Sequence, residues 1–440
     1  MKRNLINTPL FALFAGAFLF ESGTAFASSP VIIGEGTYDS AIYATEEDTT
    51  GGSSLYINGG TFNLYSSVSN PDLYLYGGGS EGVSITGNTY FQFNAGEVLP
   101  GDWSHSLYGG GSLNTTITGS SKFEMNGGSI YGADLNRSAI FGASRPGSVV
   151  KGNSQVVINA GTIKGLTIYG GADGANTRFD GQMGTYSHYI DLAETSTVEG
   201  NASVTIGENA TVYTVVAGGR GNSVIKGNVS LNINGKTSNV NQGGDQYGKI
   251  YGITSATFGS KAVTGSIISA GDIYGSNVSF KDDGSVDSVV DANKIVVYST
   301  YNGSTVNGVL QGFGTFGSYD DPVNTVYGSI NVKINDGTKV TSNVRSAGLA
   351  THVLGNTSLT ISGENTNIGG NVYAGSERGS QIDGNATLII DSATVKGDVY
   401  GGGYGIYYKD NSGEYANQDA VIKGNSNVIV RNATVEGGIY

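Results

Sequence analysis

The chain has 440 residues, of which 72 are glycine and none is cysteine, and its formal net charge is −13. The acidic balance argues against a nucleic-acid partner, and the lack of cysteine excludes disulfides and thiolate metal sites. Charged residues make up only 13% of the chain, which argues against charge-driven disorder, and the glycines lack the fixed spacing of collagen.

The N-terminal segment has the order of parts found in a secretory signal peptide. Met1–Arg3 is positive, Leu10–Phe20 is mainly apolar, and Ala25–Ala27 offers the small residues that a signal peptidase recognises. The apolar run is shorter than the roughly 20 residues that a membrane-spanning helix needs. We therefore predict a cleaved signal peptide at 1–27 and an exported mature chain that begins at Ser28.

A four-residue motif recurs along the mature chain. An aliphatic residue, a variable residue, glycine and asparagine begin each clear copy, and weaker copies precede the first of these. Where nothing is inserted, successive copies start about 27 to 33 residues apart, which is a period typical of solenoid repeats. The asparagines of the clear copies are Asn153, Asn201, Asn228, Asn356, Asn385 and Asn425.

Each motif leads into short stretches in which apolar and polar residues alternate. Leu359–Ile361 and Val204–Ile206 show the first stretch, Ala393–Val395 the second, and Val399–Tyr400 the third. Such alternation is typical of strands with one buried face. Glycine pairs such as Gly401–Gly402 follow and permit sharp corners. One unit is therefore predicted to contain three short strands separated by corners.

Strands of this kind cannot close a hydrophobic core alone, but stacked units can. We predict an all-β fold, a right-handed single-stranded parallel β-helix of roughly a dozen rungs with three strands per rung. A β-propeller or an antiparallel sandwich would instead need hairpin turns and four-stranded units. The motif asparagines are expected to form hydrogen-bonded ladders between rungs.

The mature chain divides into two regions in this interpretation. Residues 28–82 form an N-terminal capping region with the first rungs, and 83–440 form the repetitive β-helix. Loop insertions interrupt the rod, because chain closure costs little more for a long loop than for a short one. The longest predicted insertions are 172–197, 280–300, 310–325 and 403–421.

The signal peptide, the repeat, the abundance of glycine and asparagine and the absence of cysteine together resemble the passenger region of Gram-negative autotransporters. The resemblance covers nearly all of 28–440 and implies an adhesin-like passenger at the cell surface, in the outer membrane or in the medium. It also implies a C-terminal outer-membrane β-barrel, which would be the only contact with the membrane. This sequence ends at Tyr440 inside a repeat, without the barrel's series of amphipathic strands, so we expect a truncated C-terminus.

Candidate catalytic groups are confined to the insertions. A catalytic carboxylate pair must be held rigidly about 5 to 10 Å apart, whereas carboxylates in loops are usually solvated. The candidates are Asp282, Asp283 and Asp287, then Asp320 and Asp321, and finally Arg178 and Asp180 near His188. The other two histidines, His105 and His352, are isolated, and no motif of a serine nucleophile occurs. We expect no catalysis, no cofactor and no metal site.

Tyrosine is abundant, and most corner tyrosines occupy equivalent positions in the repeat. We interpret them chiefly as a structural stack along the rod, with an exposed stripe for sugars or proteins as the alternative. They are Tyr76, Tyr108, Tyr131, Tyr169, Tyr251, Tyr274, Tyr327, Tyr373 and Tyr400. The insertion 403–421 breaks this pattern with Tyr404, Tyr407, Tyr408 and Tyr415. Tyrosine-rich loops are common in recognition surfaces, so these four are the preferred partner-contact residues.

These observations lead to one preferred function and two alternatives. The preferred function is a surface-exposed, non-catalytic adhesin or interaction scaffold that binds a protein or glycan on a host or neighbouring cell. The first alternative is a secreted β-helix lyase or hydrolase that acts on polysaccharide. The second is a structural component of a surface layer or filament.

Overall fold

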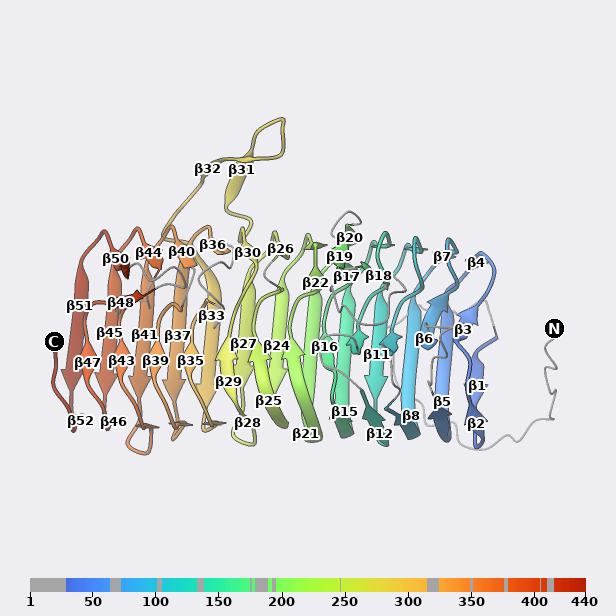
Figure 1. Ribbon diagram of the computed structural model, residues 1–440, viewed down its shortest axis with the longest axis horizontal. Helices are drawn as coiled ribbons and strands as arrows, with labels where there is room; N and C mark the ends of the chain where they lie inside the picture. The colour runs from blue at the N-terminus through green and yellow to red at the C-terminus, as the bar shows by residue number, and fades with distance from the viewer. Residues whose placement is uncertain are drawn as a thin grey trace.

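The computed structural model describes most of the chain as a single elongated stack of strands (Figure 1). The described residues are 29–63, 73–100, 105–132, 138–174, 176–178, 189–191, 195–245, 247–314, 324–348, 351–375, 379–403, 405–409 and 415–440. The predicted signal peptide at 1–27 lies outside them. Within the described residues the structure is all β, and it contains no helix that could cross a membrane.

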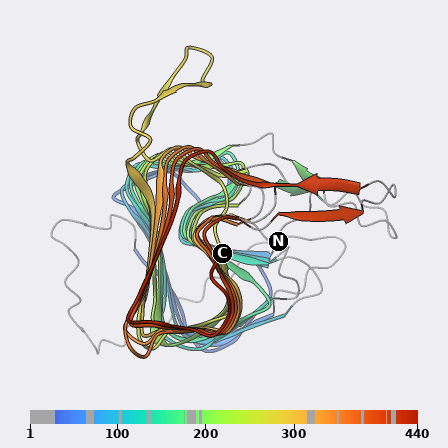
Figure 2. The same ribbon diagram turned by 90° about the vertical axis from the view of Figure 1, so that its left-hand side faces the viewer.

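Every strand of the stack pairs in parallel with the equivalent strands of the neighbouring units. For example, β41 (Thr357–Ser362) pairs with β45 (Ala386–Asp391), which pairs in turn with β51 (Ser426–Arg431). One parallel sheet contains 32 strands and a second contains 12. Viewed end-on, the strands superpose as the walls of one coil (Figure 2). The predicted all-β parallel solenoid is therefore confirmed.

The 32-stranded sheet folds into three walls, which we name in chain order after the glycine–asparagine corner. The first wall contains β1 (Val31–Ile33), β5 (Ser53–Asn63), β8 (Thr89–Leu99), β11 (Ser121–Met125), β15 (Ser154–Lys164), β21 (Ala202–Val216), β24 (Val229–Ile233), β27 (Thr254–Phe258), β33 (Ile295–Asn302), β37 (Ser329–Asn335), β41, β45 and β51. The second wall contains β2 (Thr37–Tyr38), β12 (Ser129–Tyr131), β25 (Lys236–Asn241), β28 (Val263–Thr264), β34 (Thr305–Val306), β38 (Lys339–Val340), β42 (Asn367–Ile368), β46 (Thr394–Val395) and β52 (Thr434–Val435). The third wall contains β3 (Ile42–Thr45), β6 (Leu73–Gly79), β9 (His105–Tyr108), β13 (Ala139–Phe141), β16 (Thr167–Tyr169), β29 (Ser266–Ile268), β35 (Leu310–Gln311), β39 (Val344–Arg345), β43 (Val372–Tyr373) and β47 (Val399–Tyr400).

The 12-stranded sheet adds a fourth short strand to each described coil from the second onward, where the sequence led us to expect three. In one coil, β44 (Ser380–Ile382) precedes β45, β46 and β47. This strand has only one inward aliphatic residue, Ile382, so its alternation is too short to detect. The other members are β4 (Thr49–Thr50), β7 (Ser84–Thr86), β10 (Thr116–Ile117), β14 (Val149–Val150), β20 (Ser196–Val198), β23 (Ser223–Ile225), β26 (Lys249–Ile250), β30 (Asp272–Ile273), β36 (Asn324–Val326), β40 (Thr351–Val353) and β50 (Ala420–Ile422).

The core is the column of inward side chains that the alternation predicts. Leu359 and Ile361 of β41 are fully buried, and so are Leu388 and Ile390 at the matching positions of β45. The residues that alternate with them, such as Thr360 on β41 and Ile389 on β45, point outward and are only partly buried. Because each coil covers the apolar residues of the next, the core runs the length of the rod.

Glycine precedes asparagine at the corner because two successive coils approach closely there. A Cβ atom at Gly200 would lie 2.5 Å from Asn153 Oδ1 and 2.6 Å from the carbonyl oxygen of Gly152. Asn201 follows and donates its backbone N–H to Asn153 Oδ1 at 2.8 Å. The asparagine ladder is therefore present, but it joins side chain to backbone.

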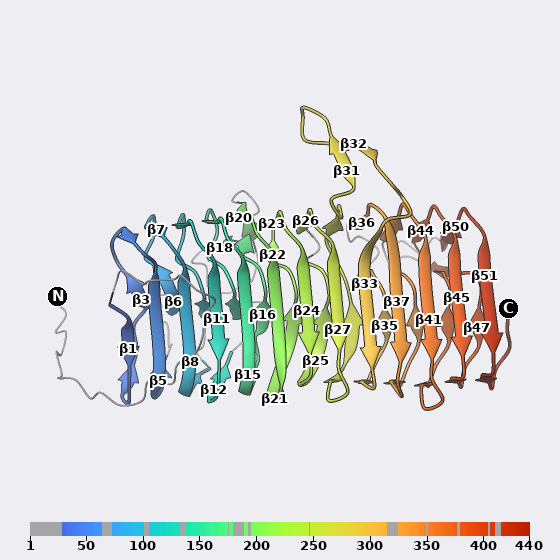
Figure 3. The same ribbon diagram turned by 180° about the vertical axis from the view of Figure 1, so that it is seen from behind.

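The insertions form antiparallel pairs outside the parallel stack. These pairs are β18 (Asn176–Arg178) with β19 (Tyr189–Asp191), β31 (Val278–Phe280) with β32 (Val286–Val289), and β48 (Ile406–Lys409) with β49 (Tyr415–Gln418). The β31–β32 hairpin stands well clear of the rod (Figure 3). Parts of the predicted insertions belong to the stack instead, because β33 occupies 295–302, β35 occupies 310–311 and β50 begins at Ala420.

Candidate functional site

The outward side chains of the third wall form an aromatic row in the N-terminal half of the rod. Strand pairing aligns Tyr43, Tyr76, Tyr108, Phe141 and Tyr169. Neighbouring ring centroids lie 4.8 to 5.2 Å apart, with interplanar angles of 4° to 12°. Tyr76 and Tyr108 are buried, with a stacked ring on each face. These inner rings have no face left for a sugar, which supports the interpretation as a structural stack.

Two further stacks occupy other parts of the rod. Tyr373 lies 4.9 Å from Tyr400 on the third wall, and Tyr400 lies 5.3 Å from Tyr440. Beside the 12-stranded sheet, Tyr274 stacks on Tyr327 at a centroid distance of 4.8 Å, and Tyr251 packs on Tyr274 at 4.9 Å with its ring tilted by 30°. Tyr131, which shares their sequence pattern, lies instead at the end of β12 in the second wall.

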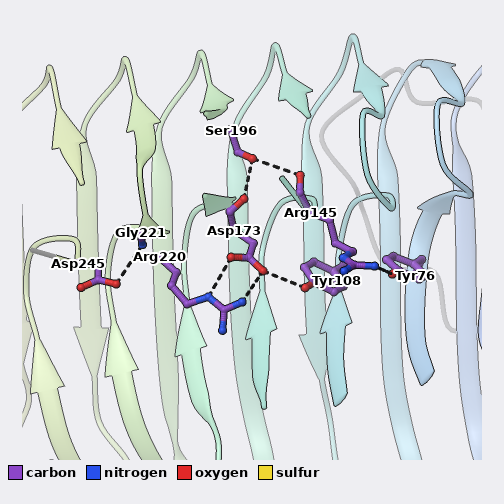
Figure 4. Close-up of polar contacts among 8 residues, drawn as sticks. All are labelled: Tyr76, Tyr108, Arg145, Asp173, Ser196, Arg220, Gly221 and Asp245. Atoms are coloured by element: carbon purple, nitrogen blue, oxygen red, sulfur yellow. Dashed lines mark hydrogen bonds and ion pairs between the residues drawn. The ribbon is translucent and has the colours of Figure 1, made fainter. Parts of the chain in front are cut away.

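A buried ion pair between Asp173 and Arg220 lies beside the first aromatic row (Figure 4). Arg220 Nε donates to Asp173 Oδ1 at 2.9 Å, and Nη2 donates to Oδ2 at 2.7 Å. The Tyr108 hydroxyl donates to the same Oδ2 at 3.1 Å. Burial, reinforced by Asp173, raises the pKa of Tyr108 well above its usual value. Burial opposes the charge of Arg220, but Asp173, Tyr169 and Tyr108 together outweigh it and raise the guanidinium pKa.

This ion pair lies at the base of the insertion between β16 and β20. Asp173 belongs to β17 (Asp173–Gly174), which pairs with β22 (Arg220–Gly221) just outside the main sheets. Ser196, at the far end of the insertion, donates to the carbonyl oxygen of Asp173 at 2.6 Å. It also lies 3.2 Å from the carbonyl oxygen of Arg145 (Figure 4). Both ends of the insertion are therefore fixed to the rod and to each other.

The β31–β32 hairpin is fixed at its base by one buried side chain, Asn277. Asn277 Nδ2 donates to the carbonyl oxygens of Asp291 and Tyr327, each at 2.7 Å. Its Oδ1 accepts the backbone N–H of Asp291 at 3.1 Å, and the side chain is 1% exposed. Phe280 also packs on Tyr251 and Tyr274, at ring distances of 5.5 Å. Hydrogen bonds and aromatic packing thus set the direction of the hairpin.

The preferred contact loop forms the β48–β49 hairpin between β47 and β50. Backbone pairing places Tyr407 opposite Asn417, Tyr408 opposite Ala416, and Lys409 opposite Tyr415. Tyr404 lies outside the described residues. The base is held by neighbouring coils, since Gly379 N–H donates to the Asp419 carbonyl oxygen at 3.0 Å. This hairpin and β31–β32 project from different sides of the rod (Figure 2).

The carboxylates that we considered for catalysis do not come together in a described site. Asp282, Asp283 and Asp287 lie on the exposed β31–β32 hairpin. Asp283 Oδ1 accepts the backbone N–H and the hydroxyl of Ser285, at 2.9 and 2.6 Å. These hydrogen bonds lower the Asp283 pKa. Asp180, His188, Asp320 and Asp321 lie outside the described residues, as do the side chains of Arg178 and His105.

A polar cluster that the sequence did not reveal lies on the outer face of β40, β44 and β50. His352 Nε2 lies 3.1 Å from Asp383 Oδ2 and 2.9 Å from Gln381 Nε2. Lys423 Nζ lies 2.9 Å from Asp383 Oδ1. Burial raises the pKa of Asp383, but hydrogen bonds from Lys423 and its neighbours outweigh this effect and lower it. Its only sequence signal is that Asp383 and Lys423 both precede a motif glycine.

Among the residues that the structure describes, no three histidine, aspartate or glutamate side chains form a group that could hold a metal ion. Comparison of the chain with protein-family models, with curated proteins and with solved structures finds no match.

Proposed function

We propose that the chain is the surface-displayed passenger of a Gram-negative autotransporter and acts as a non-catalytic adhesin or interaction scaffold. In this proposal the solenoid is a right-handed, single-stranded β-helix of roughly a dozen rungs. Its insertions bind a protein or glycan on a host or neighbouring cell. The rod holds them away from the surface that displays it.

The observation that carries this proposal is the anchoring of the insertions. Asp173 and Ser196 fix the two ends of one insertion, and Asn277 fixes the base of the β31–β32 hairpin. A loop whose base is held by buried hydrogen bonds loses less conformational freedom when it binds a partner. Such anchoring favours a role of the insertions in binding a partner, because a loop that only connected two strands would not need a fixed base.

The scaffold suits several weak contacts made at once. Each described coil pairs with its neighbours on several walls, so one insertion cannot shift along the rod without breaking those sheets. Insertions at fixed separations can engage several sites on one target surface. Linked contacts of this kind raise overall attachment by about 10² to 10⁴-fold over a single contact.

Attachment of coated beads to cells tests the proposal. Beads carrying residues 28–440 are added to epithelial monolayers and to Gram-negative bacteria, beside beads that carry a variant in which 405–418 is replaced by a short glycine–serine linker. The proposal predicts saturable attachment to one of these cell types that the variant loses at least in part. Equal attachment by both bead types, or attachment to neither cell type, contradicts it. Circular dichroism on both proteins verifies that the rod is intact.

A further inference from the structure

The polar cluster on β40, β44 and β50 occupies the outward positions of three successive coils. Strand pairing aligns His352 with Gln381, and Gln381 with Val421. Val353 and Ile382, the next residues on β40 and β44, are fully buried in the core. The side chains of His352 and Asp383 are 31% and 28% exposed, and that of Lys423 is 55% exposed. A rigid sheet therefore presents these polar groups to solvent.

The four side chains of the cluster cannot satisfy all of their hydrogen-bond donors and acceptors among themselves. In a neutral histidine each ring nitrogen is either a hydrogen-bond donor or an acceptor, and it cannot be both. His352 Nε2 therefore cannot donate to Asp383 and accept from the Gln381 amide at the same time. Lys423 Nζ has three donor positions, of which the contact with Asp383 uses one. The Gln381 amide donates one N–H to Asp383 Oδ1 at 2.6 Å, so its second N–H has no acceptor in the cluster when His352 Nε2 donates to Asp383. The cluster therefore keeps one Gln381 N–H and two Lys423 donor positions unused at fixed positions on the sheet.

Charge selects among the ligands that these groups could bind. The ammonium of Lys423 and the carboxylate of Asp383 lie 2.9 Å apart, so their opposite charges offset each other. Asp383 would repel an anion, and Lys423 would repel a cation. A hydroxyl group can both donate and accept, so a ligand rich in hydroxyls matches the mixture of donors and acceptors without opposing either charge.

The cluster also adjoins the preferred contact hairpin. The β49 strand ends at Gln418, and Ala420 begins β50 after a single intervening residue. Lys423 follows directly after β50. The cluster therefore lies close to the base of the hairpin, where the hairpin rejoins the rod.

We propose that the outer face of β40, β44 and β50 binds the hydroxyl groups of an uncharged glycan through Gln381, Asp383, Lys423 and His352. The inference rests on the proposed function and narrows the partner from a protein or glycan to a neutral saccharide. Asp383 accepts from sugar hydroxyls, while Lys423 and the Gln381 amide donate to them.

The rod contains a matched control for this site. Lys226 Nζ lies 2.9 Å from Glu199 Oε1, and these residues immediately follow β23 and β20 of the same sheet. Lys226 and Lys423 have the same side-chain exposure, 55%. Lys226→Ala and Lys423→Ala therefore remove equivalent exposed pairs between neighbouring coils, one far from the contact hairpin and one beside it.

Printed glycan arrays probed with labelled residues 28–440 test the inference, followed by titration calorimetry with the uncharged glycan that is bound best. Lys423→Ala is expected to weaken binding by about tenfold or more, because a hydrogen bond to a charged group is lost, and Gln381→Ala by about two- to tenfold, because the hydrogen bond lost is to a neutral amide. Lys226→Ala is expected to bind like the wild type. Gln381→Ala retains the pair of Lys423 with Asp383, so it tests the site even if Lys423→Ala fails to fold.

Three outcomes overturn the inference. They are equal loss of binding in Lys226→Ala and Lys423→Ala, binding to charged glycans alone, and attachment of coated beads to cells without any glycan binding. In the last case the proposed function stands with a protein as partner. Failure of the beads to attach to any cell type contradicts the proposed function instead, whatever the array shows.

Discussion

Asn201 joins its coil to the next by accepting the backbone N–H of Asn228 through Oδ1 at 2.8 Å. The backbone bonds on either side are regular, because Gly227 N–H donates to Gly200 and Ala202 N–H donates to the Asn228 carbonyl oxygen. The turn at the corner leaves the Asn228 N–H without a carbonyl partner in that ladder. The asparagine side chain supplies the missing acceptor, which explains why the motif ends in asparagine.

Replacing this side chain should destabilise the rod modestly. Asn201→Ala removes the acceptor for Asn228 N–H, and we expect a loss of about 1 kcal/mol, the usual net value of one hydrogen bond. Urea unfolding followed by circular dichroism measures the change in midpoint. Asn209→Ala is the control, because Asn209 lies exposed in the same strand β21. Equal midpoints for the two variants would show that the ladder does not contribute to stability.

The glycine of the motif should tolerate substitution less well than the asparagine. In Gly200→Ala the new methyl group meets Asn153 Oδ1 and the Gly152 carbonyl, so neighbouring coils must move apart. Overpacking of this kind costs about 1–3 kcal/mol. Gly402→Ala is the control, since a Cβ atom there meets nothing within 4 Å. The same urea experiment should give a clear shift for the first variant alone, and a shift of equal size in both would refute the steric explanation.

The fold could be predicted from the sequence because its determinants are local and repeated. The alternation at Leu359 and Ile361 fixes which side chains enter the core, and the spacing of the motif fixes the stacking. The fourth strand of each coil was missed because the pattern assigns the single aliphatic residue of β44, Ile382, to the start of the repeated motif. Its pairing with neighbouring coils defines this strand, and one unit of sequence does not reveal that pairing.

The polar clusters could not be predicted because they depend on register between distant coils. Asp173 and Arg220 are 47 residues apart, and an insertion of irregular length separates them. His352 and Asp383 are 31 residues apart and meet only because β40 and β44 are neighbours. In contrast, the tyrosine stacks were predictable, since residues such as Tyr373 and Tyr400 occupy equivalent positions in successive repeats.

The buried ion pair at the base of the first insertion should be sensitive to the loss of either partner. Asp173→Asn leaves Arg220 charged and buried without its counter-ion, and breaking such a pair costs about 3–5 kcal/mol. Thermal unfolding at neutral pH measures the effect. Arg431→Leu removes the pair with Asp391 on the outer surface, where Arg431 is 62% exposed, and should leave the midpoint unchanged. A larger effect from Arg431→Leu than from Asp173→Asn would contradict this account.

The β31–β32 hairpin should lose its fixed direction when Asn277 is replaced. Asn277→Ala removes three hydrogen bonds at the hairpin base, so we expect faster amide hydrogen exchange across 277–291 and little change in the stack. Exchange followed by mass spectrometry resolves the two regions. Asp283→Ala, which disturbs only the turn with Ser285, should accelerate exchange at the tip alone. Unchanged protection at the base in Asn277→Ala would mean that Phe280 packing suffices.

Replacing two carboxylates near the 12-stranded sheet should change the pH dependence of thermal stability in opposite directions. The folded pKa of Asp383 is lowered, so its contribution is present above about pH 4 and is lost as the pH falls through the folded value. The folded pKa of Asp272 is raised, because burial outweighs the hydrogen bond from Thr325 and the charge of Lys249. Asp272 therefore binds its proton more tightly when folded, and acid favours the folded state at this group. Asp383→Asn should flatten the loss of thermal stability between about pH 5 and pH 2, whereas Asp272→Asn should steepen it. Melting temperatures measured across this range decide the matter, and slopes that change in the same direction for both variants would refute the assignment of the two environments.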